Sequence, residues 1–339
     1  MGRSLVKEAA AAFCNGDYAN ALDLYKVAGA TLGENVFKAN IILCQNRLAN
    51  ARGKTYANKP LREIKVACVM DEFTFASYKD ICTLQQLSID QWQSELEQLQ
   101  PDILFIESAW RGKNDAWNRK ISQASPELLG TLEWCKERTI PTMFWNKEDP
   151  VHFGTFLNTA KRFDYVFTTD LNCIGNYKRD LGHDRVYLLP FGCNPIDHNP
   201  IEKFQRKPKA CFAGSYYVRY PERIRDLDAL LETFIGHSGV DIYDRNYGKE
   251  DANYAFPGKY KPLILGNLKY EDIDLAYKGY EYGINLNSVK YSPTMFARRV
   301  FELLASRTMV VSNYSQGVRL FFGDLVISSD SKSEIAEKL

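Results

Sequence analysis

Three side chains that can take up a proton lie within five residues of one another in the segment FWNKEDPVHFG, residues 144–154. They are Glu148, Asp149 and His152. Carboxylate and imidazole groups are common general bases, and they also bind sugar hydroxyls. The segment follows a predicted strand, and open α/β sheets bind ligands at the carboxyl ends of their strands. A plainer interpretation is that Asp149-Pro150 is a turn and that His152 caps a helix.

A second segment, residues 282–317, predicts a strand, a polar loop with Thr294, a helix over 296–306 and another strand. The free N–H groups at a helix start near Phe296 would favour an anion. The same loop and helix contain three cationic side chains, Lys290, Arg298 and Arg299. Glu302 shares a helix face with Arg298, four residues earlier. One acid among cations suits a nucleoside diphosphate: the cations bind the phosphates, and the acid accepts a hydrogen bond from a ribose hydroxyl. The alternative is an exposed ion pair worth about 0.3–0.5 kcal/mol.

A third segment, CFAGSYYVR, ends a predicted strand at Gly214 and Ser215. Glycine lets the backbone approach a ligand, and serine can donate to a phosphate. Arg219 could hold a diphosphate with two-point geometry, with Arg223 and Arg225 as weaker candidates. The alternative is a solvated basic helix face.

Two further strand ends in the first half of the chain carry polar groups. MDEFTF contains Asp71, and ESAWRG contains Glu107 and Trp110. A tryptophan beside charged groups suits sugar stacking, and equally suits an aromatic packed on the surface. We expect these residues on the acceptor side of a site, an inference from fold analogy alone.

Apolar runs alternate with helical stretches from Ile64 onward, as in a doubly wound α/β sheet. The first series of predicted strands comprises residues 64–70, 103–108, 141–146, 165–170 and 186–191. The second comprises 210–215, 240–244, 263–267, 282–287, 309–313 and 324–329. No G-x-G-x-x-G motif follows the first strand, which argues against a dinucleotide dehydrogenase.

These series predict an α/β protein with two Rossmann-like domains, residues 59–200 on the acceptor side and 201–339 on the donor side. Residues 1–58 are Ala-rich, with Ala21, Tyr25 and Ala28 at helical spacing. This pattern resembles a tetratricopeptide repeat, which needs neighbours to bury its face. We expect this segment to pack on the next domain or to bind a protein partner.

Composition excludes several classes of protein. The net charge of +1 gives no electrostatic basis for binding nucleic acid. No window has the roughly 18 apolar residues of a membrane span, so membrane contact should be peripheral at most. The eight cysteines lack C-x-x-C spacing, which indicates buried thiols in a reducing compartment and no zinc site. We expect no metal and no cofactor.

From Ile64 to the end, the chain resembles GT-B glycosyltransferases of the group-1, CgeB-like kind, found in bacterial surface-polysaccharide loci. The motifs are FWNKEDPVHF, FDYVFTTD, LLPFGCNP, CFAGSYYVRYPER, GINLNS and RRVFELLASRTMVVSN. The resemblance implies a cytoplasmic enzyme, at most associated with the inner face of the membrane. It also implies a sugar transferred from a nucleotide sugar to a hydroxyl of a glycan or lipid-linked acceptor.

In this family an acid in the position of Glu302 contacts the donor ribose, and Arg299 falls near the phosphates. Many retaining members carry another acid eight residues earlier, where this chain has Thr294. The stereochemical outcome is therefore open. If the enzyme is inverting, Glu148, Asp149 or His152 is the base. GT-B enzymes usually end with helices that cross back onto the first domain, so the donor domain is expected to be truncated.

Two other functions fit the same features. One is a non-catalytic GT-B-like scaffold, which the missing second acid favours. The other is a different GT-B enzyme, an epimerase or a phosphorylase. Epimerases need a denser set of acids, and no lysine for pyridoxal phosphate is identifiable.

Overall fold

The computed structural model describes residues 2–33, 37–51 and 59–339, which form two compact units, 1–63 and 64–339. The first unit contains helices α1 (Gly2–Cys14), α2 (Tyr18–Leu32) and α3 (Lys38–Ala51). Ala21, Tyr25 and Ala28 are buried in its core, as their spacing predicted. The relation to tetratricopeptide repeats stays a prediction. Most of the predicted linker over 50–60 lies outside the described residues.

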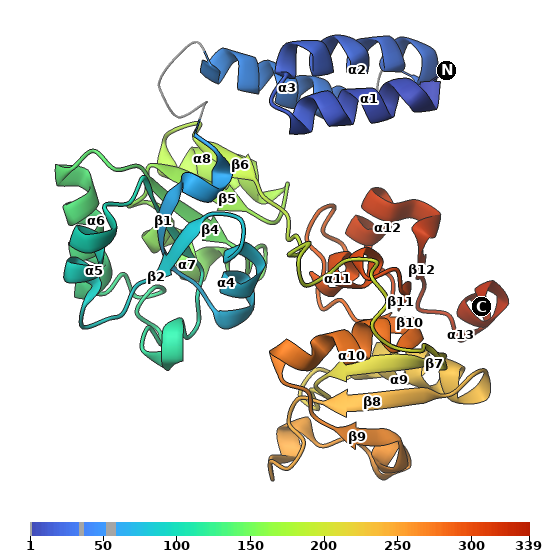
Figure 1. The fold of residues 1–339 in the computed structure, drawn as a ribbon. Coiled ribbons are helices and arrows are strands. Elements are labelled where there is room, and N and C mark those ends of the chain that lie inside the picture. The colour runs from blue at the N-terminus through green and yellow to red at the C-terminus, as the bar shows by residue number, and fades with distance from the viewer. Residues whose placement is uncertain (1, 34–36, 52–58) are drawn as a thin grey trace. The chain divides into compact units, whose positions relative to one another are not determined.

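The second unit begins with a six-stranded parallel sheet in the order β2-β1-β3-β4-β5-β6 (Figure 1). Its strands are β1 (Lys65–Val69), β2 (Thr83–Gln86), β3 (Ile103–Glu107), β4 (Thr142–Asn146), β5 (Tyr165–Thr168) and β6 (Val186–Leu188). The helices between them are α4 (Glu72–Tyr78), α5 (Trp92–Leu99), α6 (Pro126–Glu137), α7 (Phe153–Ala160) and α8 (Cys173–Leu181). Polar β2 is the strand of this sheet that the sequence did not predict.

A second six-stranded parallel sheet follows, in the order β12-β11-β10-β7-β8-β9 (Figure 1). Its strands are β7 (Lys207–Gly214), β8 (Val240–Asp244), β9 (Ile264–Gly266), β10 (Tyr280–Asn285), β11 (Met309–Ser312) and β12 (Val326–Ser328). Its helices are α9 (Pro221–Gly236), α10 (Ile273–Lys278), α11 (Arg299–Ala305), α12 (Gln316–Phe322) and α13 (Lys332–Lys338). Helix α11 begins at Arg299, three residues after the predicted start.

Side chains of β7 alternate between two separate cores. Ala210 and Phe212 pack with α9, whereas Cys211 and Ala213 pack with α10 and α11. A parallel sheet buried on both faces explains why its strands are continuous apolar runs. The predicted fold, two Rossmann-like domains preceded by a helical segment, is confirmed. No helix among the described residues is long and apolar enough to cross a membrane.

Strand order identifies the edge of each sheet where a ligand would bind. The order reverses between β1 and β3 in the first sheet, and between β7 and β10 in the second. Open α/β sheets bind ligands at such switch points, beyond the carboxyl ends of the strands. Asp71 follows β1, Ser215 follows β7 and Asn287 follows β10.

Candidate active site

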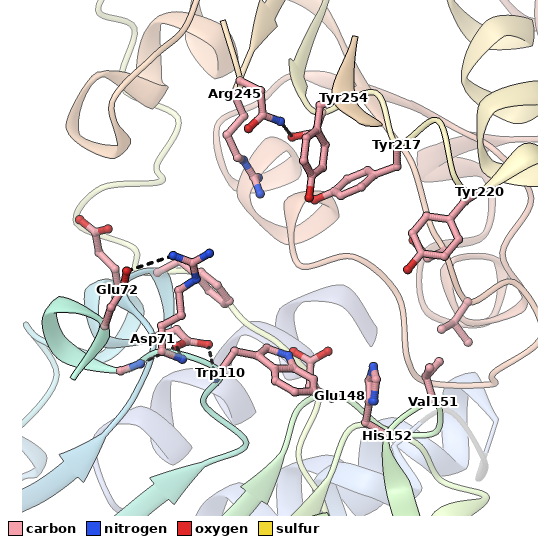
Figure 2. Close-up of a pocket in the computed structure, with 18 of the residues that line it drawn as sticks. Asp71, Glu72, Trp110, Glu148, Val151, His152, Tyr217, Tyr220, Arg245 and Tyr254 are labelled. Atoms are coloured by element: carbon pink, nitrogen blue, oxygen red, sulfur yellow. Dashed lines mark hydrogen bonds and ion pairs between the residues drawn. The ribbon is translucent and has the colours of Figure 1, made fainter. Parts of the chain in front are cut away.

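A cavity of about 2100 Å³ lies within the second unit, lined by loops from the carboxyl ends of both sheets. Figure 2 shows Arg245, Tyr217 and Tyr220 on one side of it, and Glu148 and His152 on the other. Two sheets with their switch points at one cavity can hold two different substrates. This cavity is our candidate active site.

Glu148 and His152 both line the cavity, as the sequence predicted. They lie in the loop between β4 and α7, where the His152 N–H donates to the Glu148 carbonyl at 3.1 Å. His152 also occupies the N-cap position of α7, as the plainer interpretation expected, but its side chain makes no capping hydrogen bond. Its ring packs edge-to-face on Trp110, with 4.9 Å between centroids (Figure 2).

Asp149 lies between these two residues in sequence but is not among the residues that line the cavity. Its carboxylate is fully buried and accepts hydrogen bonds from Asn146 Nδ2 at 2.7 Å and Thr168 Oγ1 at 2.6 Å. Burial raises the pKa of Asp149 to about 7, and the charges of Asp170 and Glu148 add to the rise. Because Asp149 is buried and does not line the cavity, we interpret it as holding the loop in place, and Glu148 and His152 stay as base candidates.

We expect Asp149→Asn to flatten the dependence of folding stability on pH between about 4 and 7. The native pKa of Asp149 lies above its unfolded value, so the native state binds more protons in this window. The free energy of unfolding therefore falls as pH rises, by about one proton's worth for this group. Urea unfolding at several pH values would measure both slopes. Equal slopes would contradict a protonated Asp149.

Asp71 and Trp110 line the cavity, whereas Glu107 is buried beneath it. Lys147 Nζ joins the two acids, at 2.7 Å from Asp71 Oδ2 and 2.9 Å from Glu107 Oε1. Asp71 also accepts the backbone N–H groups of Trp110, Arg111 and Gly112. Burial would raise the pKa of Asp71, but Lys147 and these N–H groups hold it below its usual value. Asp71 therefore keeps its charge and has little capacity left for an acceptor.

Positive charge collects on the wall formed by the second sheet. Arg223 from α9 and Arg245 after β8 line the cavity, and neither forms an ion pair with any residue in the described part of the chain. Burial lowers the pKa of Arg223 to about 10, and the charges of Arg299 and Arg245 contribute. The pKa of Arg245 is lowered by burial and by Arg299. Two unpaired guanidinium groups facing a cavity form a site for an anion.

Four residues predicted near the diphosphate take different positions. Ser215 and Arg219 line the cavity; Ser215 Oγ accepts from Asn246 Nδ2 at 3.1 Å. Gly214 does not line it: a Cβ there would lie 2.7 Å from the Phe212 ring, so packing explains the glycine. Arg299 lies behind the cavity, where its Nη2 donates to the Ala213 carbonyl at 2.5 Å. Its charge lowers the pKa of Arg223 and of Arg245, which do line the cavity.

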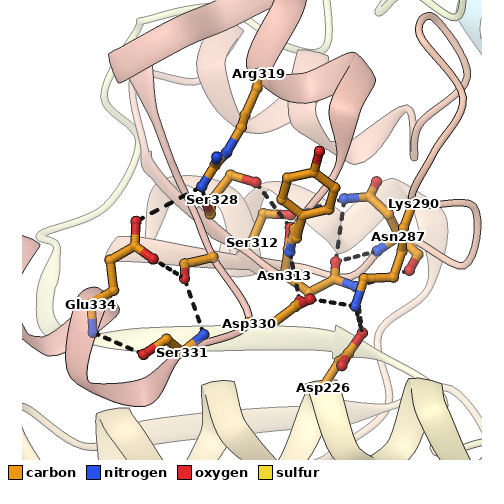
Figure 3. A network of polar contacts seen from close by, with 12 residues as sticks. Asp226, Asn287, Lys290, Ser312, Asn313, Arg319, Ser328, Asp330, Ser331 and Glu334 are labelled. Atoms are coloured by element: carbon orange, nitrogen blue, oxygen red, sulfur yellow. Dashed lines mark hydrogen bonds and ion pairs between the residues drawn. The ribbon is translucent and has the colours of Figure 1, made fainter.

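Lys290 lines the cavity but is not a free cation (Figure 3). Its Nζ lies 2.7 Å from Asp226 Oδ2 and 2.6 Å from Asp330 Oδ2. These two hydrogen-bonded acids raise the pKa of Lys290 against the effect of burial. Asn313 Nδ2 also donates to Asp226, and the Asn313 side chain accepts the Asn287 N–H. Lys290 therefore fixes the donor-side loop rather than supplying charge for a phosphate.

The remaining predicted donor residues are buried outside the cavity lining. Phe296 belongs to the core that α11 and α12 share. Glu302 accepts from Tyr277 Oη at 2.9 Å and pairs with Arg298 Nε at 3.1 Å. Thr294 hydrogen-bonds residues after β5. Glu302 would need a different side-chain position to reach a ribose, and its role in donor binding stays a prediction.

Metal sites are not evident: the described residues hold no group of three or more His, Cys, Asp or Glu able to bind an ion.

No family model matches the chain, and no curated protein matches it in sequence. Among solved structures, T4 phage BGT in complex with UDP-glucose is 10% identical, with a TM-score of 0.46 and coverage of 81% of this chain and 87% of that chain. UDP-GlcNAc 2-epimerase from Neisseria meningitidis is 9% identical, with a TM-score of 0.42 and coverage of 81% and 90%. The UDP-forming trehalose-phosphate synthase from Burkholderia vietnamiensis is 10% identical, with a TM-score of 0.42 and coverage of 74% and 69%. Likeness at this level carries no argument about activity or substrate.

Proposed function

We propose that this protein is a glycosyltransferase that moves a sugar from a nucleotide-sugar donor to a hydroxyl acceptor. One observation carries the proposal: Arg223 and Arg245, which form no ion pair within the described residues, line the same cavity as Glu148 and His152. Figure 2 shows Arg245 across this cavity from Glu148 and His152. The arginines suit the diphosphate of a donor, and the opposite pair suits a hydroxyl that must lose its proton. In this proposal the second sheet supplies the residues that bind the donor, and the first sheet supplies those that act on the acceptor.

In the proposed reaction the bond between the sugar C1 and the donor phosphate breaks, and the acceptor oxygen forms the new bond to C1. The leaving nucleoside diphosphate gains negative charge, which Arg223 and Arg245 stabilise in place of a metal ion. His152 accepts the proton of the acceptor hydroxyl, since imidazole is the commonest proton acceptor in active sites. Glu148 accepts hydrogen bonds from other hydroxyls of the acceptor. This assignment corresponds to inversion at C1.

The finer parts of the proposal rest on the sequence motifs alone. They are a cytoplasmic location, with at most an association with the inner face of the membrane, a role in bacterial surface-polysaccharide or glycoconjugate synthesis, and a protein partner for the N-terminal helices.

The test is turnover of a panel of nucleotide sugars, with release of nucleoside diphosphate as the readout. We expect His152→Ala to lower kcat by about 10²- to 10⁴-fold, the usual contribution of a general base, with donor affinity kept. Glu148→Gln should mainly raise the KM of the acceptor. A normal kcat for His152→Ala would remove this residue from the mechanism.

Binding of nucleotides, measured separately by calorimetry, distinguishes the alternatives. If nucleotide sugars bind and none is turned over, the non-catalytic scaffold replaces the enzyme. If no nucleotide binds, the donor site itself is wrong.

A further inference from the structure

Two buried threonines at the carboxyl end of β5, Thr168 and Thr169, hold the loop that carries Glu148 and His152. Thr169 Oγ1 lies 3.4 Å from the Lys147 carbonyl and 3.2 Å from the Asp149 carbonyl. These carbonyls flank Glu148, so the hydroxyl fixes the backbone on both sides of it. Its neighbour Thr168 donates to the Asp149 carboxylate at 2.6 Å. The segment after β5 therefore sets where the Glu148–His152 loop lies.

That segment is in turn held by the second sheet. Thr294 Oγ1 donates to the Thr169 carbonyl at 2.8 Å and accepts the Leu171 N–H at 2.9 Å. Thr294 is buried, and it lies in the loop between β10 and α11. Other residues of this loop line the donor wall of the cavity: Asn287, Ser288, Val289, Lys290 and Met295. Two hydroxyls in series, those of Thr294 and Thr169, thus connect the donor wall to the backbone that carries Glu148.

A second contact joins the same two loops independently. It runs through the Phe73 ring of α4, which has Lys147 Nζ and Arg298 Cζ each 4.2 Å from its centroid. Lys147 precedes Glu148, and Arg298 ends the loop that contains Thr294. Two points of contact constrain the relative position of the loops more than a single hydrogen bond would.

We propose that Thr294 is a positioning residue, through which the loop at the donor wall sets the position of Glu148 and His152. Its part in transfer rests on the proposed glycosyltransferase activity, whereas the mechanical link between the loops does not. Donor binding to the loop over 287–298 would then align the groups that act on the acceptor. Coupling of this kind can be carried by a continuous chain of hydrogen bonds between the two loops, which Thr294 and Thr169 provide.

Hydrogen exchange of the ligand-free protein tests the link directly. Thr294→Val keeps the shape of the side chain and removes both hydrogen bonds. We expect amides over 147–153 and 168–171 to exchange about fivefold faster, the effect of one lost buried hydrogen bond on local opening. Thr294→Ser should restore slow exchange. The control is Thr131→Val, a buried threonine in α6 whose hydroxyl donates to the Glu127 carbonyl of its own helix.

Unchanged exchange over 147–153 in Thr294→Val, or an equal change in Thr131→Val, would overturn the link. Turnover then separates positioning from mere stability. We expect Thr294→Val to lower kcat by about fivefold or more with the affinity for nucleoside diphosphate kept, and Thr294→Ser to recover it. A full kcat with faster exchange would overturn the positioning role. If the wild type binds nucleotides without turnover, the proposed activity fails and the exchange result still decides the link.

Discussion

Arg245→Met is expected to weaken the binding of UDP and other nucleoside diphosphates by about 10- to 100-fold, the value of a charge-assisted hydrogen bond in a partly buried site. Arg223→Met should have an effect of similar size, because both guanidinium groups face the same cavity. The loss in kcat/KM should be at least as large, since charge on the diphosphate grows as the sugar leaves. Titration calorimetry and steady-state kinetics measure the two quantities.

Stability separates this interpretation from a structural role for the arginines. Neither residue forms an ion pair in the described ranges of the chain. The charge of Arg299 lowers the pKa of both, and the charge of Arg245 also lowers the pKa of Arg223. Removing one cation should therefore leave the free energy of unfolding unchanged or raise it. Arg225→Met is the control, because Arg225 is an exposed residue of the same helix outside this cavity. If Arg225→Met weakens nucleotide binding as much, the anion site is wrongly placed.

The sheets could be predicted from the sequence because buried parallel strands are continuous apolar runs. IKVACVM and ACFAG gave β1 and β7 directly, and the alternation with helices gave two domains. Strand β2 was missed because TLQQ is polar: it lies at the edge of the sheet, beside β1. The start of α11 was placed too early because Phe296 has a helical spacing with Val300, although it packs into the core before the helix begins.

The candidate site was predicted less well, because the state of a charged side chain depends on partners far away in sequence. Lys290 looked like a free cation, yet its two acids lie 64 and 40 residues away. Asp71 looked like an available acid, yet Lys147 is 76 residues further along. Arg245 was missed because nothing near it in the sequence marks it as a cation that faces a cavity. Its place beside the site follows from the pairing of β8 with β7, the strand at the switch point.

The same long-range pairing makes Lys147 the residue whose loss should cost most stability. Lys147 is 1% exposed and is the cation between Asp71 and Glu107. Lys147→Met would leave the buried Glu107 and the partly buried Asp71 close together without the cation that pairs with both. Breaking a buried ion pair in this way typically costs about 3–5 kcal/mol. Urea unfolding would measure the loss, and a cost below about 1 kcal/mol would contradict a charged triad.

A double-mutant cycle shows whether the cost comes from the stranded acids. Glu107→Gln removes the fully buried acid, whose pKa burial and Asp71 raise against the effect of Lys147. Lys147→Met/Glu107→Gln should therefore be more stable than Lys147→Met alone, because Asp71 keeps its three backbone N–H donors. In Lys147→Met the native pKa of Glu107 lies further above its unfolded value, so the native state holds an extra proton. The free energy of unfolding that Lys147→Met loses relative to the wild type should then grow as pH rises from about 4 to 7 and shrink in acid. A deficit that is the same at both ends of this range would indicate lost packing around the lysine stem instead of unpaired charge.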